Sequence, residues 1–231
     1  MPLLSDFVNL LYPKLCASCE QVLLKAEKEI CLVCKEKLPK TNYHLHADNE
    51  VAKTFWGRIS LKAATAYLFF NKEGNVQNLL HNIKYKGAKQ AAAELGYWYG
   101  SELKNAIEFE ETTLIMPVPL HESKLKKRGF NQAEWFARGI AESMQLPLST
   151  GNLVRGLASE TQTKKSRFER WQNVAEVFII KDAAAIQNNN ILLVDDVITT
   201  GATLEACAQA IFAVNCSCKI SVAAIAFASK N

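Results

Sequence analysis

The sequence predicts an α/β fold, with a parallel β-sheet flanked by helices and a small cysteine-rich module at its start. Two observations lead to this prediction. From about residue 59, apolar runs typical of buried strands alternate with amphipathic stretches of helical period. Four of the seven cysteines, by contrast, lie within the first 45 residues, where strand-like alternation is sparse. We therefore expect a module over residues 1–45 and an α/β domain over residues 46–231.

Composition fits a globular protein, because 49% of the residues are apolar and 22% are charged. No apolar run approaches the roughly 20 residues that a spanning helix needs, so we expect no membrane span. The first residues lack the basic region and the cleavage site of a signal peptide, which makes the cytoplasm the expected location. A net charge of +4 permits contact with phosphates or nucleic acid without requiring either.

Strands are expected at the short apolar runs, which cover residues 63–70, 113–118, 176–180, 191–194 and 219–227. The run 191–194 is apolar on both faces, which favours a central parallel strand covered by helices on each side. Apolar residues at helical spacing predict helices around residues 76–83 and 204–212, and a third helix after Asn131.

The most informative segment is Ile191-Leu192-Leu193-Val194-Asp195-Asp196-Val197-Ile198-Thr199-Thr200-Gly201-Ala202-Thr203. The strand brings the chain to the carboxyl edge of the sheet, where ligands of open α/β folds bind. Gly201 allows a tight turn, and successive N–H groups in such a turn and at the following helix start favour an anion. We therefore predict a phosphate site in residues 199–203, here called the Thr/Gly loop, which consists of Thr199, Thr200, Gly201, Ala202 and Thr203.

The adjacent carboxylates of Asp195 and Asp196 repel each other, so they need partners that favour negative charge. Sugar hydroxyls and magnesium both meet that need. The alternative is a plain capped helix, with Thr203 as its N-cap and the two acids solvated at a turn. We favour ligand binding, because the whole run is less expected by chance than its single residues.

This run resembles the signature of type I phosphoribosyltransferases, in which four apolar residues precede two acids and a Thr-Thr-Gly-x-Thr turn. Residues 191–203 match that signature throughout. The resemblance implies the type I phosphoribosyltransferase fold, with Asp195 and Asp196 on the ribose hydroxyls and the Thr/Gly loop on the 5-phosphate. It also implies 5-phosphoribosyl 1-pyrophosphate as the ligand, with Mg²⁺ on its pyrophosphate.

The N-terminal cysteines form two C-x-x-C pairs, Cys16 with Cys19 and Cys31 with Cys34. Four thiolates at this spacing suit one tetrahedral Zn²⁺ ion, and a closed shell of four cysteines leaves no position for a substrate. We therefore expect a structural zinc that lets a short segment with few large apolar side chains fold. Free thiols or two disulfides are the alternatives. The other three cysteines are expected to be small core residues: Cys207, Cys216 and Cys218.

Two segments, residues 121–129 and 155–170, are rich in Lys, Arg, Ser and Thr, and we expect both to be exposed loops. The first follows an expected strand end and leads through Gly129 into a helix. A mobile cationic loop can fold over a pyrophosphate and stabilise the charge that develops as it leaves. On composition alone, a solvated surface is an equally good interpretation.

The order of the motifs resembles the ComF family over nearly the whole chain. The shared motifs are the cysteine pairs, Lys84-Tyr85-x-Gly87, Pro117-x-Pro119-Leu120, Arg128-Gly129-Phe130-Asn131-Gln132, Arg155, Thr161-Gln162-Thr163, Arg167, Arg170, Asn173 and the Thr/Gly loop. The resemblance implies roles at the pyrophosphate for Lys84, Arg128, Asn131 and Gln132. It places Val118, Pro119 and Leu120 in the pyrophosphate-loop region, although the two prolines depart from the small-residue loop usual in the enzymes.

Three functions follow from the resemblance and the residues. The first is magnesium-dependent transfer of the phosphoribosyl group to an unidentified nitrogen nucleophile, with loss of pyrophosphate. The second is handling of single-stranded DNA in competence, with a helicase-type partner, through basic residues 124–128 and 164–170 and the aromatic rings of Phe130, Phe168 or Trp171. The third is a sensor that keeps the pocket but performs no chemistry. The fold alone does not separate these functions.

Overall fold

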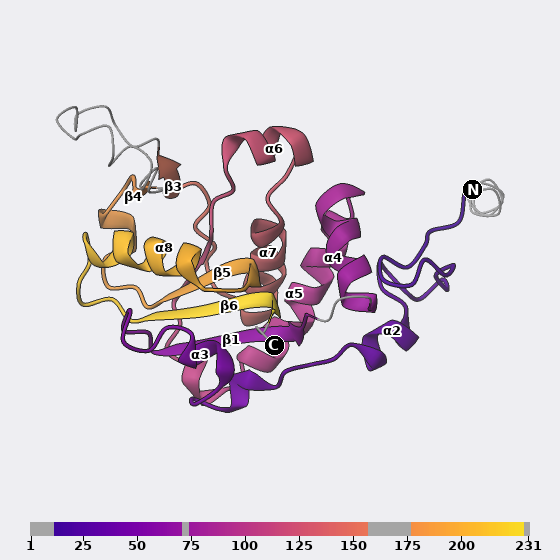
Figure 1. The fold of residues 1–231 in the computed structure, drawn as a ribbon, viewed down its shortest axis with the longest axis horizontal. Coiled ribbons are helices and arrows are strands. Elements are labelled where there is room, and N and C mark those ends of the chain that lie inside the picture. The colour runs from indigo at the N-terminus through magenta and orange to yellow at the C-terminus, as the bar shows by residue number, and fades with distance from the viewer. Residues whose placement is uncertain (1–11, 71–73, 157–176, 229–231) are drawn as a thin grey trace, which may run out of the picture.

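The structure is a computed structural model that describes residues 12–70, 74–156 and 177–228 (Figure 1). Its centre is a parallel sheet with the strand order β1-β6-β5-β2. These strands are β1 (Ala63–Phe69), β2 (Leu114–Pro117), β5 (Ile191–Ile198) and β6 (Ile220–Phe227). The predicted parallel sheet is therefore confirmed, with β5 in its interior. Since all four strands are parallel, their carboxyl ends meet at one edge.

Helices cover both faces of this sheet. One face packs against α4 (Asn75–Tyr85), α5 (Lys89–Leu103) and α7 (Gln132–Met144), and the other packs against α3 (Glu50–Lys53) and α8 (Ala202–Phe212). Along β5, Leu192 and Val194 belong to the first core, whereas Ile191 and Leu193 belong to the second. The apolar run of β5 thus has the two-sided burial that its sequence predicts.

A second, smaller sheet lies beside the main one. It pairs β3 (Leu153–Gly156) with β4 (Val177–Ile180) in antiparallel register. Arg155 therefore lies in a strand, and its expected place in an exposed loop is wrong. The rest of that expected loop lies outside the described residues, together with Thr161, Gln162, Thr163, Arg167, Phe168, Arg170, Trp171 and Asn173.

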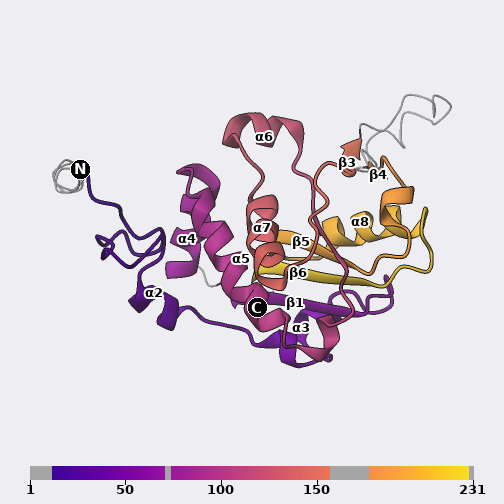
Figure 2. The ribbon, with the colours of Figure 1, turned by 180° about the vertical axis from the view of Figure 1, so that it is seen from behind.

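The basic segment after β2 forms a helix, α6 (Glu122–Arg128), so its prediction as a loop is wrong. His121 Nδ1 accepts a hydrogen bond from the N–H of Ser123 and begins the helix, while Gly129, at φ 79°, ends it in the left-handed conformation. The exposure expected of this segment is confirmed, because none of the helix residues is buried. Figures 1 and 2 show α6 standing away from the body of the molecule.

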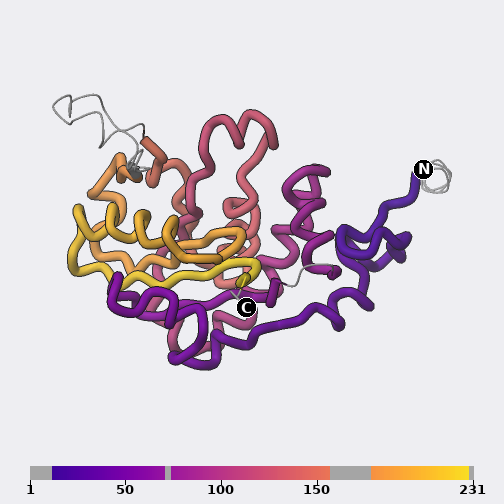
Figure 3. Tube along the Cα trace, in the orientation of Figure 1, coloured from indigo at the N-terminus to yellow at the C-terminus, as the bar shows by residue number. Residues whose placement is uncertain are grey.

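The N-terminal segment runs from the cysteine pairs through α2 (Leu32–Lys37) to α3, and Figure 3 traces this path along one side of the molecule. Among the described residues, three short 3-10 turns join these elements: η1 (Tyr43–Leu45), η2 (Ile107–Phe109) and η4 (Ala184–Ile186). Across the described parts of the chain, no helix has both the length and the apolar character needed to cross a bilayer.

Candidate functional site

The carboxyl half of β5 carries both predicted acids. The strand continues through Asp195 and Asp196 to Ile198, so the expected strand end at Val194 is wrong. The physical reason is the ladder with β6, in which Asp195 is in register with Ala224 and Ile198 with Phe227. Both acid side chains are only partly buried, and they lie where the strand approaches the sheet edge.

The two carboxylates repel each other and are stabilised by nearby positive charge. Desolvation and the charge of Asp196 raise the pKa of Asp195 to about 7, against the opposing effects of Lys84 and Lys124. The backbone N–H of Asp196 donates to Asp195 Oδ1 at 2.8 Å. Lys84 Nζ lies 3.0 Å from Asp196 Oδ2. The pair is therefore incompletely neutralised, and a cation or hydroxyl donors would stabilise it further.

The Thr/Gly loop links β5 to α8. Gly201 is the N-cap of α8, at φ 72°, and has no side chain to cap the helix, while the N–H of Ala202 donates to Thr200 Oγ1 at 3.5 Å. Thr203 lies inside the helix, so the alternative that made it the N-cap is wrong. A pocket of about 30 Å³ is lined by Asp195, Val197 and residues 198–204. The N–H groups of a first helical turn have no intrahelical acceptor, so this pocket combines the carboxylate of Asp195 with backbone donors.

The loop rests on a segment from the N-terminal half of the chain. A Cβ on Gly201 would lie 2.6 Å from Phe55 Cε1, so the backbone approaches this buried ring as only glycine allows. Arg58 Nη1 donates to the carbonyl of Thr200 at 2.7 Å, and its Nη2 pairs with Glu205 in the first turn of α8. Our sequence interpretation missed Phe55, Arg58 and Glu205. No local signal marks Arg58, which is 142 residues from Thr200 along the chain.

Lys84 and Arg128, both predicted at the pyrophosphate, come from neighbouring helices. Lys84 lies in the last turn of α4 and reaches Asp196, as given above. The guanidinium of Arg128, at the end of α6, lies 5.4 Å from the ring centroid of Tyr85, the residue next to Lys84. Arg128 Nη1 also donates to Oε1 of the buried Gln132 at 2.8 Å.

Val118, Pro119 and Leu120 follow β2 at the same sheet edge. The N–H of Val118 donates to the carbonyl of Val194 at 2.8 Å, which ties this turn to β5. Asn131 Nδ2 donates to the carbonyl of Val118 at 2.9 Å, and Asn131 Oδ1 accepts from the N–H of Ala133 at the start of α7. Both ends of the Asn131 amide are thus engaged in holding the turn against α7.

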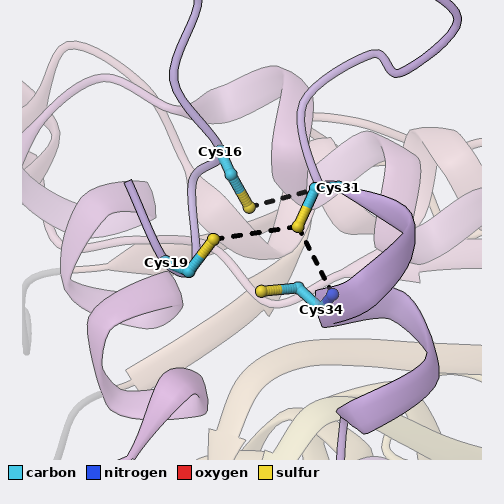
Figure 4. Close-up of side chains that lie close together, drawn as sticks. All are labelled: Cys16, Cys19, Cys31 and Cys34. Carbon is cyan, nitrogen blue, oxygen red and sulfur yellow. Dashed lines mark hydrogen bonds between the residues drawn. The ribbon is translucent and has the colours of Figure 1, made fainter. Parts of the chain in front are cut away.

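The four N-terminal cysteines form a compact group, here called the cysteine cluster (Figure 4). Their Sγ atoms all lie within 4.8 Å of one another, and Cys19 Sγ is 3.7 Å from Cys31 Sγ. A tetrahedral zinc with Zn–S bonds of about 2.3 Å places its sulfurs about 3.8 Å apart. None of the seven cysteines forms a disulfide, so the two-disulfide alternative is wrong. The donor set and its spacing are compatible with a metal site.

Backbone donors favour a thiolate at Cys16, whereas burial raises the pKa of Cys31 and of Cys34. The N–H groups of Cys31 and Ser18 point at Cys16 Sγ at 3.3 and 3.5 Å. Although burial opposes the effect, these backbone donors, together with the backbone and side chain of Cys19, lower the pKa of Cys16 to about 7. Outside the cluster, Cys207 and Cys218 are buried as expected, but Cys216 is exposed, and its prediction as a core residue is wrong.

The cysteine segment packs directly on α4 and α5. The buried side chain of Asn82 donates from Nδ2 to the carbonyl of Ala17 at 2.9 Å. Glu94 Oε2 on α5 accepts from the N–H groups of Glu29 and Ile30 at 3.0 and 3.2 Å. The helix that carries Lys84 is therefore braced by the cysteine segment. The expected boundary between residues 45 and 46 stays a prediction.

Comparison with known proteins identifies the family of this chain. The model of the family described as "Phosphoribosyl transferase domain" matches residues 113–231. Competence protein ComFC of Bacillus subtilis (strain 168) is 30% identical over 200 residues, which cover 81% of this chain and 79% of that protein. This chain belongs to the ComF family and contains a phosphoribosyltransferase-like domain.

Two further ComF relatives are similar over different lengths. DNA utilization protein YhgH of Escherichia coli (strain K12) is 26% identical over 199 residues, covering 84% of this chain and 82% of that protein. Competence protein F of Haemophilus influenzae is 30% identical over 118 residues, covering 49% of this chain and 50% of that protein. In this ComF chain, the matched domain contains β2, α6 and the Thr/Gly loop, whereas Lys84, Arg58 and the cysteine cluster precede it.

Proposed function

We propose that this chain binds 5-phosphoribosyl 1-pyrophosphate, with the ribose hydroxyls on Asp195 and Asp196 and the 5-phosphate on the Thr/Gly loop. One observation carries the proposal. The acid pair sits in the carboxyl half of an interior parallel strand, and four residues separate it from a glycine at φ 72° that opens α8 beside a pocket. Carboxylates accept hydrogen bonds from hydroxyls, while the loop N–H groups donate to phosphate, so one short segment offers complementary groups for both ends of the sugar phosphate.

Mg²⁺ is the second component of the proposed site. The carboxylate oxygens of Asp195 and Asp196 are hard donors of the kind that Mg²⁺ prefers, and their mutual repulsion favours a nearby cation. When bound, the ion would neutralise charge on the pyrophosphate. Lys84 and Lys124 act at the same place, because the charge of each favours the ionised form of Asp195.

For the chemistry, we propose phosphoribosyl transfer to an unidentified nitrogen acceptor. The bond between C1 of the ribose and the pyrophosphate oxygen breaks, and its electron pair leaves with pyrophosphate. The acceptor nitrogen donates its lone pair to form the new bond to C1 and releases its proton to solvent. The cations on α4 and α6 support the leaving charge. Pyrophosphate release on addition of candidate bases tests this step. Binding without release would instead favour a sensor that performs no chemistry.

Calorimetry with 5-phosphoribosyl 1-pyrophosphate, with and without Mg²⁺, tests the binding itself. Replacing both acids, Asp195→Asn with Asp196→Asn, should weaken binding by at least about 100-fold, since two lost bonds to charged groups are together worth about 3–6 kcal/mol. The matched control is Asp48→Asn, an exposed acid outside the site, which should bind like the wild type. Equal affinity of the double variant, with an unchanged circular dichroism spectrum, would refute the assignment.

We further propose that the cysteine cluster holds one structural Zn²⁺. Four buried or half-buried sulfurs at close to tetrahedral spacing, with backbone N–H groups directed at Cys16 Sγ, support this assignment. The site is structural because four cysteines complete the coordination shell and leave no open position.

A second candidate function is the handling of single-stranded DNA. It is favoured by relatives named for competence and DNA utilization, and by the exposed α6, whose lysines 124, 126 and 127 could contact backbone phosphates. The other basic stretch considered for this role, residues 164–170, lies outside the described residues.

Fluorescence anisotropy with a labelled oligonucleotide, measured across salt concentrations, tests DNA binding. Replacing Lys126 and Lys127 with Ala should lower the slope of log affinity against log salt by about 0.7 for each phosphate that the variant no longer neutralises. Lys104→Ala, at the far end of α5, is the control. Binding that does not depend on salt would count against this function.

A further inference from the structure

We propose that Arg58 is a positioning residue for the Thr/Gly loop. It holds the carbonyl of Thr200 away from the pocket, and thereby aims the N–H of Gly201 into it. The inference rests on the proposed function, since it assigns that N–H as a donor to the phosphate. It concerns a side chain that lies outside the matched phosphoribosyltransferase domain.

Arg58 bridges two parts of the structure. Its Nη1 donates to the carbonyl of Thr200 at 2.7 Å and to the carbonyl of Thr54 at 3.0 Å, while Nη2 pairs with Glu205. A guanidinium can make these contacts together because its donors form a rigid planar fork, whereas a lysine ammonium is a point charge on a flexible stem. Arg58 thus fixes both the loop carbonyl and the first turn of α8.

The orientation of one peptide plane follows from this contact. The described peptide bonds are all trans, so the C=O of Thr200 and the N–H of Gly201 point in opposite directions. Arg58 holds the C=O, which leaves the N–H on the opposite side. Within the described parts of the chain, the Gly201 N–H has no protein acceptor. It precedes the first turn of α8, where N–H groups and the helix dipole favour an anion.

Phe55 restricts the orientations that the Thr200–Gly201 peptide can adopt. The Gly201 backbone lies so close to the ring that a Cβ there would be 2.6 Å from Phe55 Cε1 and 2.8 Å from Cζ. Phe55 is itself fixed, because it is buried in the core beside α3, whose N-cap Asn49 accepts from two backbone N–H groups and donates to the carbonyl of Ala64. Arg58 and Phe55 therefore form a rigid support, with the loop held on one side and the pocket left on the other.

The test compares three replacements by calorimetry with inorganic phosphate and with 5-phosphoribosyl 1-pyrophosphate. Arg58→Gln should weaken the binding of both by about tenfold, the effect expected for one misplaced donor. Arg58→Lys should fail to restore affinity, because it keeps the charge without the fork. Glu205→Gln should reduce the affinity by less than Arg58→Gln does, because Arg58 can still donate to the Thr200 carbonyl. Arg138→Gln is the control, since Arg138 pairs with Glu134 on the exposed side of α7.

A spectroscopic readout separates positioning from a general loss of stability. In the ligand-free protein, Arg58→Gln should shift the Gly201 amide resonance and speed its hydrogen exchange, while amides in the centre of β5 remain protected. If Arg58→Gln binds phosphate as wild type does, the positioning role is overturned and the proposed function stands. If the wild type binds neither compound, both the proposed function and this inference fall.

Discussion

The cysteine cluster and the Thr/Gly loop, the two sites proposed to bind a charged ligand, are assembled differently. The four cysteines lie within residues 16–34, so a short segment supplies the whole donor set. The loop depends on distant partners: Arg58 holds Thr200, and Lys84 reaches Asp196. Loss of a cluster ligand should therefore act strongly and locally, whereas the loop can be weakened from several places in the fold.

The largest expected effect is on the cluster. Cys16→Ser should abolish the binding of about one zinc per chain and loosen the segment around it, because structural zinc contributes on the order of 10 kcal/mol to the folding of small modules. Metal analysis by mass spectrometry and limited proteolysis would measure both effects. Cys216→Ser is the matched control, since Cys216 is exposed and lies outside the cluster. Wild-type protein that is fully folded and free of metal would contradict the assignment.

The next effect is on the loop, where Gly201→Ala should destabilise the protein by about 2–4 kcal/mol. Part of this cost is the left-handed conformation, about 1–2 kcal/mol, and the rest is overlap with Phe55. Denaturant unfolding measures the change. Gly87→Ala separates the conformational cost from the cost of overlap with a neighbour, because Gly87 has φ 75° but nothing within 4 Å of an added Cβ. If the two variants lose the same free energy of unfolding, Phe55 does not restrict the loop.

A smaller effect should appear in the pH dependence. The pKa of Asp195 is raised from 3.8 to about 7, so the folded state retains a proton that the unfolded chain releases. The stability from this group is full below the unfolded pKa and is lost as pH rises through about 7. In the proposed function the ionised acid binds the phosphoribosyl ligand, so affinity should change in the opposite direction and fall at low pH.

Unfolding midpoints between about pH 5 and about pH 8 would test this sign. The wild type should lose stability across that window relative to Asp195→Asn, which has no titrating group at this position. A wild type that gains stability relative to the variant would show that the pKa is not raised.

The smallest effect on stability should come from Lys84→Gln, at about 1 kcal/mol or less, because both partners of the ion pair with Asp196 still contact water and ion pairs in contact with water contribute little. The same change should weaken ligand binding clearly and raise the pKa of Asp195 further. Lys86→Gln is the control, since its pair with Glu20 is 57% exposed on both sides and far more open to solvent. Titration calorimetry of the two variants would compare them, and equal affinities would remove Lys84 from the site.

The sheet strands and the two local motifs could be predicted from the sequence because their signals are local. The two-sided apolar run of β5 and the cysteine spacing each reflect contacts made over a few residues. Helix α5 was missed because alanines, aromatic residues and two glycines interrupt a clear polar face. The glycines allow close packing instead: a Cβ on Gly96 would lie 2.1 Å from the carbonyl oxygen of Phe136 on α7.

The candidate site was predictable only in part, for a related reason. Asp195, Asp196 and the Thr/Gly loop form one segment, and Lys84 and Arg128 were available only through the family resemblance. Arg58 and Phe55 support the loop through contacts that only the folded chain creates. Helix α6 was expected as a loop because the prediction rested on its basic composition and overlooked its capping residues, His121 at the start and Gly129 after the last turn.

The sheet itself limits how this protein can be divided. The matched domain begins at residue 113, yet β6 pairs along its length with β1, which lies well before that point. All of β6 is buried, so a chain lacking β1 would present an apolar edge with unpaired N–H and C=O groups. Such an edge readily recruits strands from other molecules. By pairing with β6, the N-terminal half therefore protects this sheet edge from self-association. The phosphoribosyltransferase domain is a structural unit only together with that half.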